Sequence, residues 1–269
     1  MDLSIIIVNY NSTEKTLNCL ESIFKADLEG INYEVIVVDN NSSDKTSYNI
    51  KQKYPQIIFI SSFKNKGMGG GNNLGIKTAQ GKFYLILNPD TVVKRDAIKV
   101  MFNYIKEHDN IGILGPKLLN PDNSLQYSCA RFPKIYTPII RRTYLVNFFK
   151  KHVDWFLMKK FNHKEIKEVD WLMGSCLLIR ASISMEFDER YFMYFEDIDL
   201  CKTSWNLNYR VVYYPEARII HDHKRESAKD VWYLAFFRNK LAREHIKSWL
   251  RYFYKWKIKK IINNIKTNK

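Results

Sequence analysis

The first ninety residues alternate short apolar runs with amphipathic segments. The runs at 3–8 and 33–38 are rich in Ile and Val, which is typical of strands buried on both faces of a parallel sheet. Between them, apolar residues at helical spacing predict a helix over 12–25, namely Leu17, Leu20, Ile23 and Phe24. The later elements predicted on the same grounds are a helix from about 43 to 54, a strand at 57–61 and a strand ending at Asn88.

This threefold alternation of strand and helix predicts the fold class. It is typical of an α/β protein with a doubly wound, mostly parallel sheet and helices on both faces, as in Rossmann-like nucleotide-binding sheets. The segment 65–75, NKGMGGGNNLG, precedes the strand ending at Asn88. We expect it to form a glycine-rich loop that leads into a helix ending near residue 80. It is not a P-loop, because no Lys-Ser/Thr pair follows the glycines.

The pattern becomes less regular after residue 117. Strand-like runs return at 171–179, 210–214 and 218–220, and the segment EDIDLCKTSWNL between them has helical character. We therefore expect one domain over residues 1–228, followed by a basic helical tail over 229–269. Within the domain, residues 1–117 are predicted to form the nucleotide-binding half and 118–228 the second half.

The formal net charge of +15 belongs mostly to the tail. Residues 238–269 contain 11 Lys/Arg and the single acid Glu244, so they account for +10 of it. The apolar residues Trp249, Leu250, Phe253 and Trp256 recur there at helical spacing. Such a helix either lies on a membrane interface or packs on the protein with its lysines in solvent. The similar Trp/Phe/Lys character of 139–161 favours peripheral attachment to an anionic cytoplasmic leaflet.

Some classes of protein are excluded. No stretch supplies the about 20 apolar residues that a membrane-spanning helix needs. The apolar N-terminus has no basic lead and no cleavage site, and we interpret it as the first core strand. The four cysteines form no C-x-x-C pair, so a cysteine metal cluster is not expected.

Polar residues stand where three predicted strands end. Asn9, Asp39 and Asp90 lie at these carboxyl ends, where ligands bind in doubly wound sheets. Asp39 suits hydrogen bonds from a base or a ribose, although turn formation explains it equally well. An unpaired charge at a buried strand end is costly, so Asp90 points to a divalent cation. The alternative for Asp90 is an N-cap of the helix predicted near 94–108.

Two further groups are candidates for chemistry. The segment FEDIDL places Glu196, Asp197 and Asp199 at a helix start, directly after aromatic residues. Acids there are favoured by the helix dipole, but the aromatic neighbours indicate a site, and the helix N-terminus would keep a general base ionised. His221 ends the run RIIHDH; it is either structural or one metal ligand among oxygens.

With these residues in view, the sequence resembles the family 2 glycosyltransferases of GT-A fold, and among them the bacterial rhamnosyltransferase-type branch. The resemblance covers about residues 3–240. It rests on seven segments in order, which are SIIIVNYNS, EVIVVDNNSSD, NKGMGGGNNLG, YLILNPDT, DWLMGSCLLIR, FDERYFMYFEDIDLC and IIHDHKRES.

The resemblance implies roles for individual residues. Asp197 would be the general base of an inverting transfer, and Asp90 and His221 would hold Mg²⁺ or Mn²⁺. Asn88 replaces the first acid of the family's D-x-D motif, which implies looser metal dependence. Donor and substrate contacts would come from Asn9, Asp39, Gly67, Asn73, Asn88, Trp171, Gly174 and Glu196.

The resemblance also implies partners. The donor would be a dTDP- or UDP-sugar, with rhamnose as the branch's usual sugar, and the acceptor a cell-surface glycan carried on a polyprenyl diphosphate at the cytoplasmic membrane surface. Nucleic acid is not expected as a partner. One alternative is a sugar nucleotidyltransferase, which predicts a G-x-G-x-R loop where this chain has NYNS. The other is a non-enzymatic basic protein that binds membrane or nucleic acid, which explains the tail but not Asp39, Asp90 and Asp197.

Overall fold

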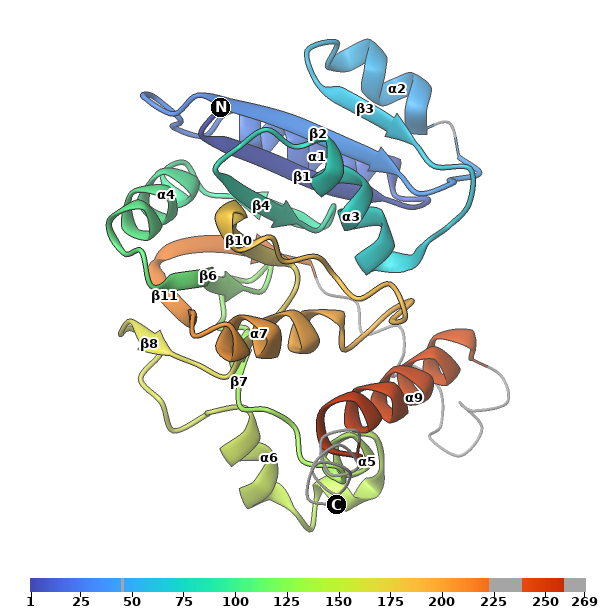
Figure 1. Cartoon of the computed structure of the whole chain (residues 1–269), viewed down its shortest axis with the longest axis vertical. Helices are drawn as coiled ribbons and strands as arrows, with labels where there is room; N and C mark the ends of the chain where they lie inside the picture. Colours follow the sequence, from blue (N-terminus) through green and yellow to red (C-terminus); the bar gives the residue numbers. More distant parts are fainter. Residues whose placement is uncertain (45, 223–238, 259–269) are drawn as a thin grey trace, which may run out of the picture.

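The computed structural model describes residues 1–44, 46–222 and 239–258 (Figure 1). Its strands are β1 Leu3–Asn9, β2 Tyr33–Asp39, β3 Ile58–Ser61, β4 Phe83–Leu87, β5 Thr91–Val93, β6 Ile111–Leu119, β7 Cys129–Ala130, β8 Lys167–Glu168, β9 Trp171–Leu172, β10 Cys176–Arg180 and β11 Arg210–His221. Its helices are α1 Thr13–Phe24, α2 Thr46–Lys53, α3 Gly67–Thr78, α4 Ala97–Glu107, α5 Thr137–Arg142, α6 Lys150–Phe156, α7 Glu196–Asn206 and α9 Lys240–Phe253. Short turns of helix are η1 Tyr144–Val146, η2 Ala181–Ile183 and the π-helical η4 Tyr254–Ile258.

The described residues form one central nine-stranded sheet with the order β3-β2-β1-β4-β10-β6-β11-β5, and β8 pairs with β11. β1 to β4 are parallel to one another, as the alternation of strands and helices predicts. β10 is inserted antiparallel between β4 and β6, while β6 and β11 are parallel. Six strands therefore run in one direction, with β10, β5 and β8 opposed, so the prediction of a mostly parallel α/β sheet is confirmed.

The second half departs in detail from the predicted elements. The apolar run at 171–179 is divided into β9, which pairs with β7, and β10, which enters the main sheet. The runs at 210–214 and 218–220 are parts of one strand, β11, whose register with β6 shifts between Tyr214 and Arg218. β6 itself was not predicted.

Two apolar layers cover the two faces of the sheet. On β1, Ile5 and Ile7 face the layer formed with α1 and α4, whereas Ile6 and Val8 face the layer that includes residues of α3, α7 and α9. This follows from the period of two along a strand, and every residue of β1 is buried because both faces are covered. Figure 1 shows β1 to β4 with α1, α2 and α3 at one end and α5, α6 and α9 at the other.

The glycine-rich segment is a helix, so the expectation of a loop was wrong. α3 begins at Gly67 and includes four further glycines, although each glycine costs about 1 kcal/mol relative to alanine in a helix. Close packing on β1 explains them, because a Cβ at Gly75 would lie 2.4 Å from Ile6 Cγ2. Gly67 has a positive φ of 75°, and a Cβ there would collide with the carbonyl oxygen of Phe192.

Helix α9 packs on the domain. Tyr252 and Phe253 are buried in the apolar layer that contains Ile6 of β1. The Trp249 indole donates to the Ile135 carbonyl (3.0 Å). Most of the apolar face that could have met a membrane is therefore used inside the molecule, leaving Leu250 exposed. No helix among residues 1–44, 46–222 and 239–258 has the length and apolar character needed to cross a bilayer. The rest of the expected tail, 229–238 and 259–269, lies outside the described residues.

Candidate active site

The carboxyl ends of β1 and β2 hold a network of polar side chains. Asn9 and Asp39 are register partners, and Asn9 Nδ2 donates to Asp39 Oδ1 (3.3 Å) and to Ser42 Oγ (3.0 Å). The Thr16 hydroxyl of α1 donates to Asn9 Oδ1 (2.7 Å). The Asn9 amide is thus fixed from α1, and it orients the carboxylate of Asp39 at the edge of the sheet.

Asp90 follows β4 and faces the end of β11. Its Oδ1 lies 3.4 Å from His221 Nε2, and its Oδ2 lies 3.8 Å from Lys15 Nζ of α1. Burial raises the pKa of Asp90, but His221 and Lys15 lower it by more, so the pKa lies below the ordinary value and Asp90 is ionised at neutral pH. The N-cap of α4 is Asp96, so the alternative structural role for Asp90 is excluded.

Gln126 fixes the orientation of His221. Gln126 Nε2 donates to Asn120 Oδ1 (3.0 Å) and to the His221 carbonyl (3.4 Å), which turns its Oε1 toward His221 Nδ1 at 2.7 Å. Nδ1 is then the donor in this contact, and Nε2 is the ring nitrogen that faces Asp90. The amide of Gln126 therefore determines which ring nitrogen faces the Asp90 carboxylate.

The Asp90–His221 pair has the properties of a partial metal site. Asp90 Oδ1 is buried and has no hydrogen-bond partner within the described part of the chain. A carboxylate oxygen and an imidazole nitrogen are both groups that can bind a divalent cation. The residues that the structure describes contain no cluster of three His, Cys, Asp or Glu able to hold a metal. Two protein ligands suit Mg²⁺ or Mn²⁺, which commonly complete their shell with water and substrate phosphates.

We predict that Gln126→Leu weakens Mn²⁺ binding by about 10- to 100-fold, because removing the hydrogen-bond partner that orients a metal-binding histidine has an effect of this size. Calorimetric titration of Mn²⁺ measures it. Gln126→Glu is the matched control: it keeps an acceptor for Nδ1 and should retain most of the affinity. A leucine variant with wild-type affinity would show that His221 does not bind the metal through Nε2.

A second group of carboxylates begins α7. Asp197 Oδ2 accepts from the Gly174 amide (3.0 Å), and Asp197 Oδ1 accepts from the Ile198 amide (2.8 Å). A Cβ at Gly174 would lie 3.1 Å from Asp197 Cβ, so glycine lets the backbone reach the carboxylate. The neighbouring Glu196 Oε2 is buried, with no hydrogen-bond partner among the residues described. Asp197 is thus held rigidly, whereas Glu196 Oε2 has no hydrogen bond from the described residues that would offset the cost of its burial.

Burial makes both acids weaker than usual. Desolvation and the charge of Asp197 raise the pKa of Glu196 to about 8, and desolvation raises the pKa of Asp197 to about 6 despite the two backbone amides. Burial outweighs the effect of the helix N-terminus on both pKa values, but a pKa of about 6 still leaves Asp197 ionised at neutral pH. At neutral pH this pair therefore holds one proton, on Glu196, and Asp197 is the available base.

Asp199, the third acid of this segment, points away from the pair. It is buried and binds Lys255 Nζ (2.7 Å) and Trp256 Nε1 (2.7 Å) of η4, as well as the Tyr191 hydroxyl (3.2 Å). Lys255 also contacts Asp188 (3.0 Å). Segments far apart in the sequence are therefore joined, and the C-terminal turn holds the first turn of α7 in place.

The backbone before α7 is strained. Tyr194 and Phe195 both have φ of 69°, which bulky side chains rarely adopt. Their rings pack on His245 of α9, and Phe195 also packs on Tyr252. This packing holds the chain in the conformation that turns Glu196 and Asp197 into the site.

The two groups of acids lie at one edge of the sheet. The Asn88 amide donates to the Ser175 carbonyl (2.9 Å), and Ser175 follows Gly174, which binds Asp197. On the other side of β4, helix α1 contacts Asn9 through Thr16 and Asp90 through Lys15. Short chains of contacts thus connect Asp39, Asp90 and Asp197, which are far apart in the sequence.

Three expected binding residues have supporting contacts. Both amide atoms of Asn73 bind the backbone of Phe187 (2.8 and 2.9 Å). Gly67 packs on Phe192, so α3 holds both ends of the segment leading to α7. The Trp171 indole is buried and donates to the Arg131 carbonyl (2.9 Å).

Several residues in the site could not be recognised from the sequence. Lys15 lies between Asp90 and Asp222 Oδ2 (3.6 Å), and Gln126 and Lys255 act from distant segments. Their types are ordinary at a helix surface or in a loop, and only tertiary structure brings them to the acids. The sequence contained a signal only for the packing of α3. Gly67, Gly71 and Gly75 are four residues apart, a spacing that indicates one close-packed face of a helix.

The chain is similar to known sugar-transferring proteins. The model of the family "Glycosyl transferase family 2" matches residues 4–167. Rhamnosyltransferase WbbL of Escherichia coli (strain K12) is 30% identical over 271 residues, which cover 97% of this chain and 94% of the relative. N-acetylglucosaminyl-diphospho-decaprenol L-rhamnosyltransferase of Mycobacterium tuberculosis is 29% identical over 212 residues, 73% of this chain and 68% of the relative.

A solved structure shares the fold. The mannosyltransferase PcManGT from Pyrobaculum calidifontis, in complex with GDP-Man and Mn²⁺, aligns over 83% of this chain and 57% of its own with a TM-score of 0.57 at 15% identity. At this identity the likeness concerns the fold, and it agrees with the GT-A architecture expected from the sequence.

Proposed function

The chain belongs to glycosyl transferase family 2, and from this premise we propose that it transfers a sugar, with inversion, from a nucleoside-diphosphate sugar to a hydroxyl group of a growing lipid-linked glycan. As a glycosyltransferase it is neither a sugar nucleotidyltransferase nor a non-enzymatic basic protein. The observation that carries the proposal is Asp197, a rigidly held carboxylate with a raised pKa at the edge where the strand-end residues meet.

The donor binds at the carboxyl ends of β1, β2 and β4. Asp39 accepts hydrogen bonds from the base or ribose, and Asn9 orients it. Gly67 and Asn73 support this pocket by holding the segment 187–192. Residues 1–117 thus supply most donor contacts and 118–228 most acceptor contacts.

Asp90 and His221 would hold Mg²⁺ or Mn²⁺. The ligand atoms would be the buried Asp90 Oδ1 and the His221 Nε2, which lie 3.4 Å apart. When bound, the ion supplies positive charge to the leaving diphosphate. Lys15 adds a second positive charge next to Asp90. Asn88, at the first position of the metal motif, contributes no charge and leaves the metal with fewer carboxylates.

Asp197 acts on the acceptor. Its carboxylate accepts the proton of the attacking hydroxyl while the oxygen bonds to the anomeric carbon and the nucleoside diphosphate departs from the opposite side. A single displacement with one base and no protein nucleophile inverts the anomeric configuration. Glu196, protonated at neutral pH, donates a hydrogen bond to substrate. Trp171 and Gly174 shape the acceptor side through the segment that binds Asp197.

The relatives support the choice of substrates. Both named rhamnosyltransferases favour rhamnose as the sugar, and the mycobacterial name specifies an acceptor on a decaprenyl diphosphate. We therefore propose a dTDP- or UDP-sugar as donor, a polyprenyl-diphosphate-linked acceptor and a peripheral position on the inner face of the cell membrane.

A thermal-shift screen tests the donor site. A ligand at 100 times its Kd adds about 2.7 kcal/mol to the free energy of unfolding, so one of dTDP, UDP or GDP with Mn²⁺ should raise Tm by several degrees. The matching nucleotide-sugar should then release nucleoside diphosphate when a polyprenyl-diphosphate-linked acceptor is added. A Tm unmoved by every nucleoside diphosphate, with and without Mn²⁺, would contradict the proposal.

A further inference from the structure

Exposed apolar side chains are concentrated in one part of the molecule. We call residues 134–160, which contain α5, η1 and α6, the α5–α6 lobe. These 27 residues contain 7 of the 17 large hydrophobic side chains exposed in the described part of the chain. Phe148 and Phe149 are 78% and 50% exposed. Large apolar side chains gathered in this way mark an interaction surface.

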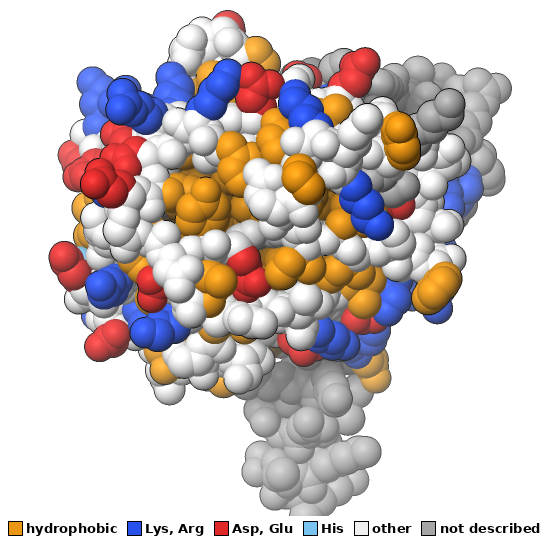
Figure 2. All heavy atoms as spheres, turned by 90° about the horizontal axis from the view of Figure 1, so that it is seen from above, with side chains coloured by type: hydrophobic (Ala, Val, Ile, Leu, Met, Phe, Trp, Pro, Cys, Tyr) orange, Lys and Arg blue, Asp and Glu red, His pale blue; other side chains and the backbone are white. Residues whose placement is uncertain are grey.

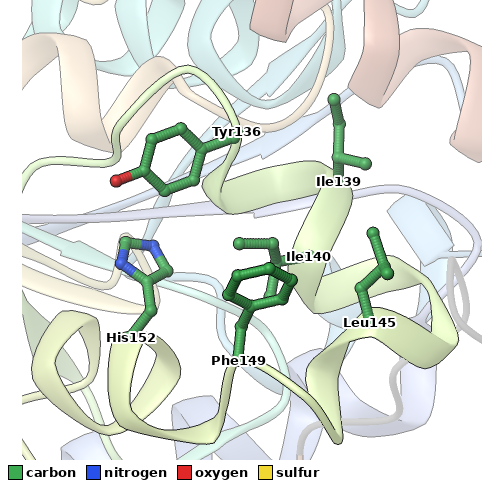
Figure 3. A pocket seen from close by; sticks show the side chains of 6 residues that line it. All are labelled: Tyr136, Ile139, Ile140, Leu145, Phe149 and His152. Carbon is green, nitrogen blue, oxygen red and sulfur yellow. The ribbon is translucent and has the colours of Figure 1, made fainter.

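The lobe also forms an apolar cavity that is open to solvent. It has a volume of about 360 Å³ and is lined by Tyr136, Ile139, Ile140, Leu145, Phe149 and His152. Figure 3 shows these side chains arranged around a common space between the helices of the lobe. His152 is the only histidine among the described residues that line the cavity, and its ring contacts the Thr137 hydroxyl (2.8 Å). Burial lowers the pKa of His152, so the lining of the cavity is uncharged at neutral pH.

The α5–α6 lobe around this cavity is strongly positive. The α5–α6 lobe contains seven Lys/Arg and a single acid, Asp154, which is paired with Lys159 (2.6 Å). Its net charge is therefore +6. Lys134 lies over the Trp155 ring at 5.0 Å, so positive and aromatic groups alternate on the surface. The opposite end of the molecule has blue and red side chains side by side (Figure 2).

Helix α9 packs against the α5–α6 lobe. The Trp249 indole binds the carbonyl of Ile135, and the charges of Arg142 and Arg141 help to lower the pKa of the buried His245. The apolar side chains of α9 are largely used in this packing. Among the described residues, the α5–α6 lobe therefore has more exposed large apolar side chains than α9 does.

We propose that the α5–α6 lobe is a docking surface for an anionic phospholipid bilayer, and that its cavity takes one lipid chain. Exposed aromatic rings such as Phe148 and Phe149 enter the boundary between headgroups and acyl chains, and the lysines of the lobe contact the anionic headgroups. Its use in presenting a lipid-linked acceptor rests on the proposed function, whereas the docking does not.

Vesicle co-sedimentation of the full chain tests this surface. The wild type should bind vesicles of phosphatidylcholine and phosphatidylglycerol (3:1) at least tenfold more tightly than phosphatidylcholine alone. Phe148→Ser/Phe149→Ser and Lys150→Glu/Lys151→Glu should each weaken binding at least tenfold. Phe63→Ser, a fully exposed phenylalanine outside the lobe, is the matched control and should bind as the wild type does.

Several results would overturn the proposal. One is wild-type affinity in the Phe148/Phe149 variant. Another is loss of binding only when Lys259, Lys260, Lys266 and Lys269 are changed to Gln. A third is a dimer in light scattering that the Phe148/Phe149 change dissociates, without vesicle binding by the wild type. The thermal shift by nucleoside diphosphate is measured on the same variants and should be unchanged, so failure of docking is distinguishable from failure of the donor site.

Discussion

Replacing Asp197 by asparagine is expected to lower kcat by about 10²- to 10⁴-fold, the usual contribution of a general base. Asparagine keeps the shape of the side chain and one acceptor for the amides of Gly174 and Ile198, but it cannot take a proton. Donor affinity should remain within about twofold of the wild type, because Asp39 and Asp90 are untouched. Steady-state kinetics with nucleoside-diphosphate release, beside calorimetry of the donor, measures the two quantities.

Glu196→Gln is the matched control for this variant. The pKa of Glu196 is raised to about 8, so the side chain is already neutral at pH 7 and glutamine reproduces that state. Its kcat should fall far less than that of Asp197→Asn. Equal losses in the two variants, or near-normal turnover by Asp197→Asn, would remove Asp197 from the role of base.

The pH dependence follows from the same burial. Because the pKa of Asp197 is raised to about 6, kcat should rise with pH through that value as the base becomes ionised. Stability should change in the opposite direction. The folded protein retains protons on Glu196 and Asp197 that the unfolded chain releases near pH 4, so these two groups make the fold less stable as pH rises from about 4 to 8.

Asp90→Ala is expected to lower kcat/KM by at least about 10²-fold, because a metal-bound diphosphate is stabilised by several kcal/mol and the variant lacks one of the two proposed protein ligands. The affinity for nucleoside diphosphate without metal should change little, since in the proposed site Asp90 would act on the diphosphate only through the cation. Calorimetry with and without Mn²⁺ separates the two effects.

Asp222→Asn provides a comparison at the same edge of the sheet. Asp222 lies near the same Lys15, but its side chain is 49% exposed. Its backbone N–H donates to the Asp90 carbonyl, and its carboxylate does not take part in this contact. It should lower metal-dependent affinity by no more than about threefold, as is common for exposed charges. If Asp90→Ala binds donor and Mn²⁺ as the wild type does, the metal site must lie elsewhere.

The sequence reveals the parts of the site that depend on strand order. Asn9 and Asp39 end two buried parallel strands, so their proximity follows from sheet geometry alone. The partners of Asp90 could not be found in this way. Lys15 and His221 are 75 and 131 positions from Asp90, and only the packing of α1 and the course of β11 bring them to it.

The glycine segment shows a different limit. Local propensity favours a loop at Gly67–Gly75, and close packing against Ile6 overrides it. The surroundings of the acids in α7 could not be predicted from the sequence either. The pattern of acids at its first turn predicted a site, but only tertiary contacts separate Asp197, which faces Gly174, from Asp199, which faces Lys255.

The ion pair between Asp199 and Lys255 has a consequence for biosynthesis. Translation proceeds from the N-terminus, and the contacts among β1, β2, β3 and β4 involve residues made early. Asp199 obtains its cationic partner only after residue 255 has left the ribosome. The nascent polypeptide can therefore assemble β1 to β4 during synthesis, while helix α7 receives its last support when nearly all of the described chain has been made.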